Sequence, residues 1–131
     1  MRSSLMTASD LMHSGDALPL IDQNASMPDA LAVMTDKGLG CVGVTDIKGV
    51  LAGMITDGDL RRHIGNNLRN RSAHEIMTKN PVTVSPDTLA ADALRTMTAG
   101  QVKITQLFVL DGASSPVGLL HIHDLLRAGL K

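Results

Sequence analysis

The chain contains two copies of one pattern, and this repeat constrains its fold more than any other feature. The segment 53–62 aligns with 118–127 at a shift of 65 residues, the difference between 118 and 53. At that shift the identical pairs include Met12 and Met77, Val44 and Val109, Asp46 and Asp111, Gly53 and Gly118, Asp59 and Asp124, Leu60 and Leu125, and Arg62 and Arg127. A unit of this size cannot bury its apolar face alone, so the two copies should fold as a pair. We expect function in the cleft between them.

Each copy is predicted to contain a short helix, a strand, a helix, two strands and a final helix. In the first copy these elements fall at residues 9–12, 18–21, 26–38, 41–45, 50–55 and 57–64. In the second copy they fall at 72–77, 81–84, 85–100, 104–110, 117–120 and 122–128. Ser26 and Ser85 are placed to cap the long helices, and Gly38 and Gly100 to end them. We therefore place the copies at 8–64 and 73–130, joined by a polar linker at 65–72.

Composition narrows the classes of function open to the chain. Of its 131 residues, 44% are hydrophobic and 19% charged, and the net charge is −1. A near-neutral chain has no basic field for nucleic acid or an anionic membrane, and Phe108 is its one aromatic side chain. The single cysteine, Cys41, lies in an apolar run, which predicts a buried strand thiol in a reducing, cytoplasmic compartment. No apolar run is long enough to span a bilayer.

The candidate binding motif is Gly53-x-x-Thr56-x-x-Asp59, at the predicted boundary between a strand and a helix. Gly53 would let a ligand approach the backbone, and the amides at the start of the helix favour an anion. Thr56 adds a hydroxyl, and Asp59 is an acceptor suited to ribose hydroxyls. Arg62 is the arginine that we expect to turn back toward this site. The alternative is that Thr56 and Asp59 only cap the helix, because their spacing is that of a capping box.

The second copy carries the matching candidates Gly118, His121, His123 and Asp124. His121 and His123 are two residues apart and would share a face in a continuing strand, so the pair could contribute two ligands to a zinc ion. No third ligand has suitable spacing, and we do not predict a metal site. The remaining histidines, at positions 13, 63 and 74, are scattered along the chain and are expected at the surface.

The motifs of both copies, in their order, resemble the cystathionine β-synthase (CBS) domain, whose tandem pairs are called Bateman modules. The short helix of that family, which ends in methionine, is similar to residues 10–12 and 75–78. Its Gly-x-x-Thr-x-x-Asp nucleotide signature is similar to residues 53–59. The resemblance covers residues 8–130. It implies an α+β fold, a tandem CBS-domain pair with pseudo-twofold symmetry in which helices flank two small mixed sheets.

Residues 56–62 and 121–129 also look like the C-terminal regulatory tail of the D-arabinose 5-phosphate isomerases. Those enzymes carry an N-terminal sugar isomerase domain and serve the synthesis of the lipopolysaccharide sugar Kdo. The resemblance implies that this chain is not itself an enzyme. It implies two kinds of protein partner, the sugar isomerase domain of the same parent enzyme and further copies of the chain in a homodimer or higher homo-oligomer. Neither nucleic acid nor a membrane is an expected partner.

The second copy departs from the family pattern, because His121 and His123 stand where Thr56 and Gly58 stand in the first. The two sites should therefore differ in ligand, and imidazoles suit a ligand with an additional anionic group. We predict that the regulatory ligand is CMP-Kdo, acting as a feedback effector, with no other cofactor. One alternative is an energy sensor that binds AMP or ATP. Another is a structural module that only oligomerises the enzyme.

Overall fold

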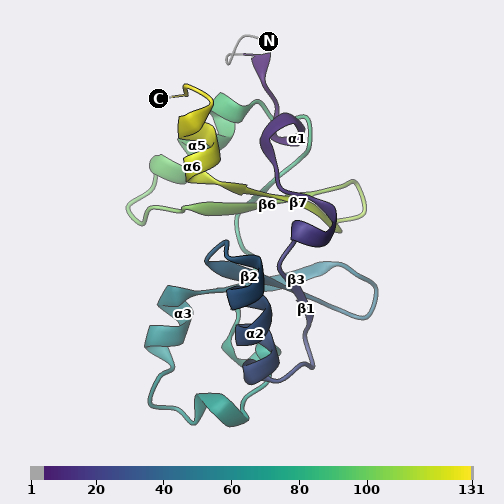
Figure 1. Ribbon diagram of the computed structural model, residues 1–131, viewed down its shortest axis with the longest axis vertical. Coiled ribbons are helices and arrows are strands. Elements are labelled where there is room, and N and C mark those ends of the chain that lie inside the picture. The colour runs from purple at the N-terminus through teal and green to yellow at the C-terminus, as the bar shows by residue number, and fades with distance from the viewer. Residues whose placement is uncertain (1–4, 131) are drawn as a thin grey trace. The chain divides into compact units, whose positions relative to one another are not determined.

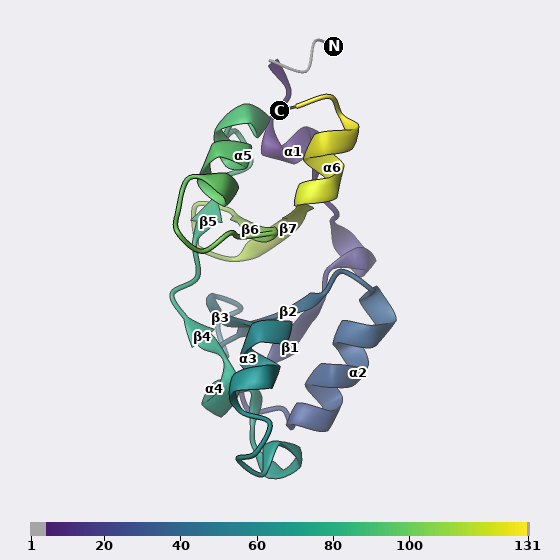
Figure 2. The ribbon, with the colours of Figure 1, turned by 90° about the vertical axis from the view of Figure 1, so that its left-hand side faces the viewer.

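The computed structural model describes residues 5–130 and divides the chain into two compact units, each built around its own sheet (Figure 1). The central unit is Pro19–Pro81. The terminal unit joins Met1–Leu18 to Val82–Lys131, of which residues 5–18 and 82–130 are described. Within each unit the α-helices cover one face of the sheet (Figure 2). The prediction of an α+β fold with two small mixed sheets flanked by helices is confirmed.

The sheet of the central unit has four strands in the order β1-β2-β3-β4. β1 (Leu20–Asp22) runs parallel to β2 (Cys41–Thr45), which forms an antiparallel hairpin with β3 (Leu51–Thr56). β4 (Thr78–Lys79) pairs antiparallel with β3 and was not predicted, since two residues are too few to show alternation. The helices are α2 (Met27–Lys37), α3 (Asp57–Arg62), α4 (Ala73–Ile76) and the 3-10 helix η3 (Leu68–Asn70).

The sheet of the terminal unit repeats this arrangement with three strands. β5 (Thr83–Val84) runs parallel to β6 (Gln106–Leu110), and β6 forms an antiparallel hairpin with β7 (Pro116–His121). In the place that β4 takes in the central unit, His13 forms an isolated bridge with Leu119 of β7. The helices are α1 (Ala8–Leu11), α5 (Ala90–Thr98), α6 (Ile122–Arg127) and the 3-10 helix η2 (Gly15–Ala17).

The two units exchange their short helices relative to the sequence copies. The helix α1 lies in the first copy but packs in the terminal unit, where the Ala8 amide donates to the Thr88 carbonyl at 2.8 Å. The helix α4 lies in the second copy but packs in the central unit, where the Ala73 amide donates to the Ala25 carbonyl at 2.8 Å. The boundaries 8–64 and 73–130 thus follow the sequence repeat, whereas each compact unit combines parts of both copies.

The long helix of the first copy forms as predicted, and that of the second begins later than predicted. The Ser26 hydroxyl accepts from the Asp29 amide at 3.3 Å at the start of α2, and Gly38 ends the helix with a φ of 68°. Residues 85–87, expected to start the second helix, instead form a turn in which the Thr88 hydroxyl accepts from the Ser85 amide at 3.1 Å. The local hydroxyl bonds compete with helix formation, and α5 begins only at Ala90.

Both predicted hairpins are confirmed, and one aspartate in each explains why their turns repeat. Asp46 Oδ1 accepts from the amides of Lys48 and Val50 at 2.8 and 3.0 Å. Asp111 Oδ1 accepts from the amides of Ala113 and Ser115 at 2.9 and 3.0 Å. An aspartate that bonds its own following backbone fixes the turn without help from the rest of the fold.

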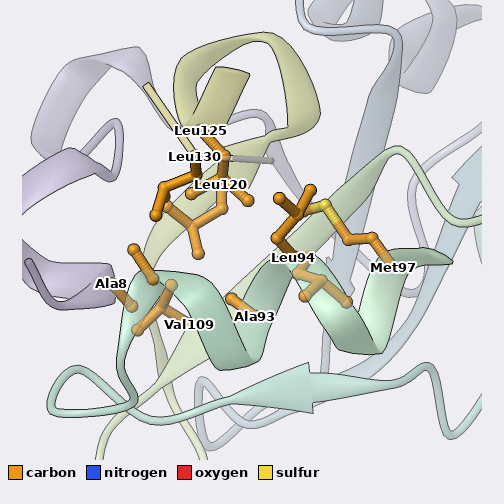
Figure 3. Close-up of a cluster of buried hydrophobic side chains, with 10 residues drawn as sticks. Ala8, Ala93, Leu94, Met97, Val109, Leu120, Leu125 and Leu130 are labelled. Atoms are coloured by element: carbon orange, nitrogen blue, oxygen red, sulfur yellow. The ribbon is translucent and has the colours of Figure 1, made fainter. Parts of the chain in front are cut away.

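Each unit has its own aliphatic core. In the terminal unit, side chains from α1, α5, β6, β7 and α6 meet in one cluster (Figure 3). In the central unit, Met27, Ala30 and Met34 of α2 pack on Val42, Val44 and Ile55 of the sheet. Cys41 is fully buried, and burial raises the pKa of its thiol to about 12, so the predicted inert strand thiol is confirmed. Among residues 5–130, no helix is long and apolar enough to cross a membrane.

Candidate functional site

The central candidate site is the corner where β3 passes into α3. Thr56 is the last residue of β3 and the N-cap of α3, and Asp59 is the third residue of that helix. The Asp59 carboxylate turns back and accepts from the Thr56 amide at 2.9 Å and from the Thr56 hydroxyl at 3.3 Å. The capping arrangement that the spacing allowed is therefore present.

The Asp59 carboxylate is buried, with a relative exposure of 3%, and its other oxygen is also occupied. Oδ1 accepts from the Thr78 hydroxyl of β4 at 2.6 Å and from the Arg62 guanidinium. Burial alone raises the pKa of the Asp59 carboxyl, but the bonds from Thr78, the Thr56 amide and Arg62 outweigh burial and hold the pKa below its ordinary value. Asp59 is thus an ionised carboxylate whose four hydrogen bonds all come from its own unit.

The terminal candidate site is the matching corner between β7 and α6, built with the same skeleton and different side chains. His121 takes the N-cap position, and its amide donates to Asp124 Oδ2 at 3.2 Å. Arg127 pairs with Asp124 as Arg62 pairs with Asp59. The place of Thr78 is taken by His13, whose Nε2 lies 2.9 Å from Asp124 Oδ2. Histidines therefore occupy both positions around Asp124 that threonines occupy around Asp59.

The geometry of the His121 ring defines its protonation state at this corner. Its Nδ1 accepts from the His123 amide at 3.2 Å, so the ring carries its proton on Nε2 and is neutral. The two rings lie with their centroids 4.5 Å apart and their planes tilted by 45°. Burial, and then the neighbouring His123, lower the pKa of the His121 imidazole; His13 and Arg127 act in the same direction, and Asp124 opposes them.

The two glycines of the candidate motif admit methionines from the exchanged short helices. A Cβ built on Gly53 would lie 2.6 Å from Met77 Sδ and 2.6 Å from the Thr78 carbonyl oxygen. A Cβ on Gly118 would lie 2.7 Å from Met12 Cγ and 2.9 Å from Met12 Cβ. Glycine lets another group approach the backbone closely, and at both positions that group belongs to the protein itself and not to a ligand.

The structure brings together the predicted residues of each copy and adds one residue to each set. Thr56, Asp59 and Arg62 meet at the central corner, and His121, His123 and Asp124 at the terminal corner. The additions are Thr78 and His13. His13 was expected as a scattered surface residue; its side chain is 34% exposed, but the β-bridge to Leu119 places its ring against Asp124, a contact that was not predicted. The repeat could have predicted that His13 and Thr78 take equivalent places, because each directly follows a methionine that is matched between the copies.

The alternative of a zinc site gains no geometric support. Among residues 5–130, no three His, Cys, Asp or Glu side chains gather in an arrangement that could hold a metal ion. His121 uses Nδ1 as a backbone acceptor, and His13 bonds to the carboxylate of Asp124, which leaves these groups engaged within the unit.

Comparison with protein families identifies both sequence copies. The model of the CBS domain matches residues 3–66 and again residues 73–131. The match is thus a tandem one and covers nearly the whole chain.

Curated relatives include the arabinose 5-phosphate isomerases KdsD. The chain is 44% identical to the enzyme of Pseudomonas aeruginosa, and the match covers 98% of the chain and 40% of that protein. It is 40% identical to the enzyme of Escherichia coli K12, with 98% of the chain and 39% of the relative covered. The chain therefore spans about 40% of the length of these relatives.

Solved structures of CBS-pair proteins share the fold. The CBS-pair protein CBSX2 of Arabidopsis thaliana superposes with a TM-score of 0.79 at 23% identity, covering 94% of this chain and 93% of that one. The structure of CBSX2 in complex with AMP gives a TM-score of 0.81 at 25% identity, covering 94% and 95%.

Proposed function

The chain belongs to the CBS-domain family, and from that premise we propose that it is a regulatory module that senses a nucleotide-containing metabolite. The observation that carries this proposal is the identity of 40–44% to arabinose 5-phosphate isomerases over 98% of the chain. Because the chain spans about 40% of those proteins, we assign catalysis to a sugar isomerase domain in the rest of a longer parent enzyme. The module would act in the cytoplasm, as part of a homodimer or higher homo-oligomer.

We propose that ligand recognition uses the two corners. Asp59 is already saturated by its own unit, so the groups open to a ligand in the central corner are the Thr56 hydroxyl and Arg62, whose side chain is 64% exposed. In the terminal corner they are the half-buried His121 and the exposed His123. Cations and imidazoles suit phosphate and carboxylate groups. The full set is Gly53, Thr56, Asp59, Arg62, Gly118, His121, His123 and Asp124, with the glycines acting indirectly through the methionines that they admit.

CMP-Kdo is the effector that we propose for this module. It carries a ribose, a phosphate and a sugar carboxylate, so it offers the additional anionic group that the imidazoles of the terminal corner would accept. A product of the pathway that binds a regulatory module of an early enzyme would give feedback. Such coupling requires that the effector bind one state of the enzyme more tightly than the other.

An adenine nucleotide is the second candidate. It is supported by the structure of CBSX2 in complex with AMP, a protein with the same fold at 25% identity. In that case Thr56 and Asp59 would serve the central corner, and Asp59 would have to exchange one of its bonds within the unit for a bond from a ribose hydroxyl. The terminal corner, with its histidines, would bind the same ligand more weakly.

Titration calorimetry of the chain with CMP-Kdo, AMP and ATP would distinguish these candidates. We expect the tightest binding for CMP-Kdo, and a roughly tenfold loss in Arg62→Gln, equivalent to one charge-assisted hydrogen bond. Arg69→Gln, an exposed arginine of the linker, is the matched control and should bind as the parent chain does. Tighter binding of AMP or ATP would refute CMP-Kdo. An unchanged melting temperature with all three ligands would favour a purely oligomerising module.

A further inference from the structure

Two threonines lie around Asp59 in the central unit, and two histidines take their places around Asp124 in the terminal unit. In the central corner the hydroxyls of Thr56 and Thr78 donate to Asp59. In the terminal corner both positions hold histidine, with His121 at the N-cap and His13 at the bridge to β7. The two histidines are 108 positions apart in the sequence, the difference between 121 and 13, and meet only in the fold. A threonine does not titrate near neutral pH, whereas histidine is the side chain that does.

Proton uptake by His121 would break a hydrogen bond at the start of a helix. Its Nδ1 is the acceptor for the His123 amide in the first turn of α6. A proton on Nδ1 turns this acceptor into a donor, leaves the amide without its cap and places a positive charge at the start of a helix. Among residues 5–130, the charged or titratable groups that act on this ring are His123, Asp124 and Arg127 of α6, and His13 from the segment after α1.

His13 is held beside Asp124 independently of the cap of α6. Its Nε2 lies 2.9 Å from Asp124 Oδ2, and the Asp124 side chain is only 11% exposed. The backbone of His13 is tied to β7 by two hydrogen bonds with Leu119, both at 2.9 Å. Loss of the cap at the start of α6 would therefore leave the segment after α1 attached to β7.

We propose that the terminal unit is a proton-responsive element, in which protonation of His121 releases the cap of α6 while His13 keeps Asp124 paired, and that the central unit lacks this response. The proton then acts as a second regulatory ligand. This inference is independent of the nucleotide proposal, because it concerns the unit in the absence of any other ligand.

The test is a pH titration of the amide and imidazole resonances of the whole chain by NMR, from about pH 8 to about pH 5, the range in which histidines titrate. We expect the Ile122 and His123 amides to shift with a common midpoint below the ordinary histidine pKa. Loss of the cap should also make the His123 amide roughly fivefold less protected from exchange with solvent at the acidic end. The amides of Asp57 and Gly58, at the matching positions of α3, should not follow that midpoint.

Substitutions taken from the other unit make the test specific. His121→Thr keeps a capping side chain and should remove the transition at Ile122 and His123, whereas His74→Thr removes an exposed histidine of α4 and should leave it unchanged. Thr56→His should introduce a transition at Asp57 and Gly58, which provides a test even if His121→Thr fails to fold. A transition that persists in His121→Thr, or that appears equally at Gly58 in the parent chain, would overturn the inference.

Discussion

The central and terminal corners share a backbone arrangement and differ in the chemistry around the carboxylate. Each has a strand that runs into a six-residue helix, an aspartate that accepts from the N-cap amide, and an arginine one turn later. Asp59 is bonded by hydroxyls, and Asp124 by an imidazole. The aspartate, its bond from the N-cap amide and its arginine partner are therefore common to both corners, while the side chains at positions 56, 78, 121 and 13 differ.

The largest effect should come from removal of a corner carboxylate. Asp59→Ala removes a buried carboxylate that is the acceptor for the Thr56 amide, the Thr78 hydroxyl and Arg62. We expect the free energy of unfolding in urea to fall by about 3 kcal/mol. Asp124→Ala should cost less, about 2 kcal/mol, because that carboxylate is more exposed.

Asp57→Asn is the control for this comparison, since Asp57 lies on the same helix at an exposed position. It should change the free energy of unfolding by no more than about 0.5 kcal/mol. If Asp124→Ala lowered the free energy of unfolding as much as Asp59→Ala, the greater burial of Asp59 would not contribute to stability.

The glycines should rank next. Gly53→Ala places a methyl group 2.6 Å from the backbone carbonyl of Thr78, which cannot move without breaking the pairing of β3 and β4. We expect it to lower the free energy of unfolding by about 2 kcal/mol. The three atoms nearest to a Cβ at Gly118 all belong to the Met12 side chain, whose outer end can adjust, so Gly118→Ala should cost about 1 kcal/mol.

Gly65→Ala is the matched control, because a Cβ there meets nothing within 4 Å. Met12→Ala combined with Gly118→Ala should recover part of the loss, since it removes the clashing side chain. Equal stability of Gly53→Ala and Gly65→Ala would show that the close approach of Met77 and Thr78 to Gly53 does not constrain the fold.

The two corners should lose their contributions to the free energy of unfolding at different pH values. The pKa of His121 is lower in the folded chain than its ordinary value of 6.5, so the unfolded chain binds the proton more readily. The neutral His121 ring therefore contributes fully to the stability of the folded chain above pH 6.5. This contribution is lost as the pH falls from 6.5 through the pKa that His121 has in the folded chain. The pKa of Asp59 is also lowered, from 3.8, so its contribution persists until the pH falls below 3.8.

Urea unfolding of the parent chain and His121→Thr at a series of pH values would check this separation. The variant should lose less stability than the parent between about pH 7 and about pH 5. Below pH 3.8 the two should decline in parallel, because Asp59 is common to both. Identical profiles over the whole range would contradict the proposed role of His121.

The smallest effect should come from the hairpin turns, where the copies also differ at one matched position. Gly49 has a φ of 79°, and Ser114, 65 residues later, has a φ of 64°. A side chain in this left-handed region costs about 1 kcal/mol, partly offset by the greater freedom of glycine in the unfolded chain. Ser114→Gly should therefore raise the melting temperature by a few degrees and Gly49→Ser should lower it, as measured by circular dichroism.

Ser115→Gly is the matched control for the hairpin turns, because it makes the same change at the next residue. Ser115 does not have a positive φ, so glycine relieves no strain there and adds only freedom to the unfolded chain. This variant should not raise the melting temperature. If it stabilised the chain as much as Ser114→Gly does, the left-handed backbone at Ser114 would not be the cause.

Features that depend on neighbouring residues were predicted well from the sequence. The cap at Ser26, the stop at Gly38 and the turns at Asp46 and Asp111 rest on bonds between residues at most four positions apart. The start of α5 was predicted too early for a related reason. Two local hydrogen-bonding schemes compete at residues 85–88, and the sequence does not say that the turn is favoured over the helix.

The sequence by itself determined the repeat, the order of elements and the capping corners, because each depends on local hydrogen bonds and hydrophobic spacing. Only the tertiary structure decided that the short helices are exchanged between copies, so that Met12 meets Gly118 and Met77 meets Gly53. It also brought His13 to Asp124 across 111 residues. Packing of a methionine against a missing Cβ and pairing of distant charges depend on where the chain returns in space. The sequence indicates which residue types could make such contacts, but only the tertiary structure determines which residues are paired.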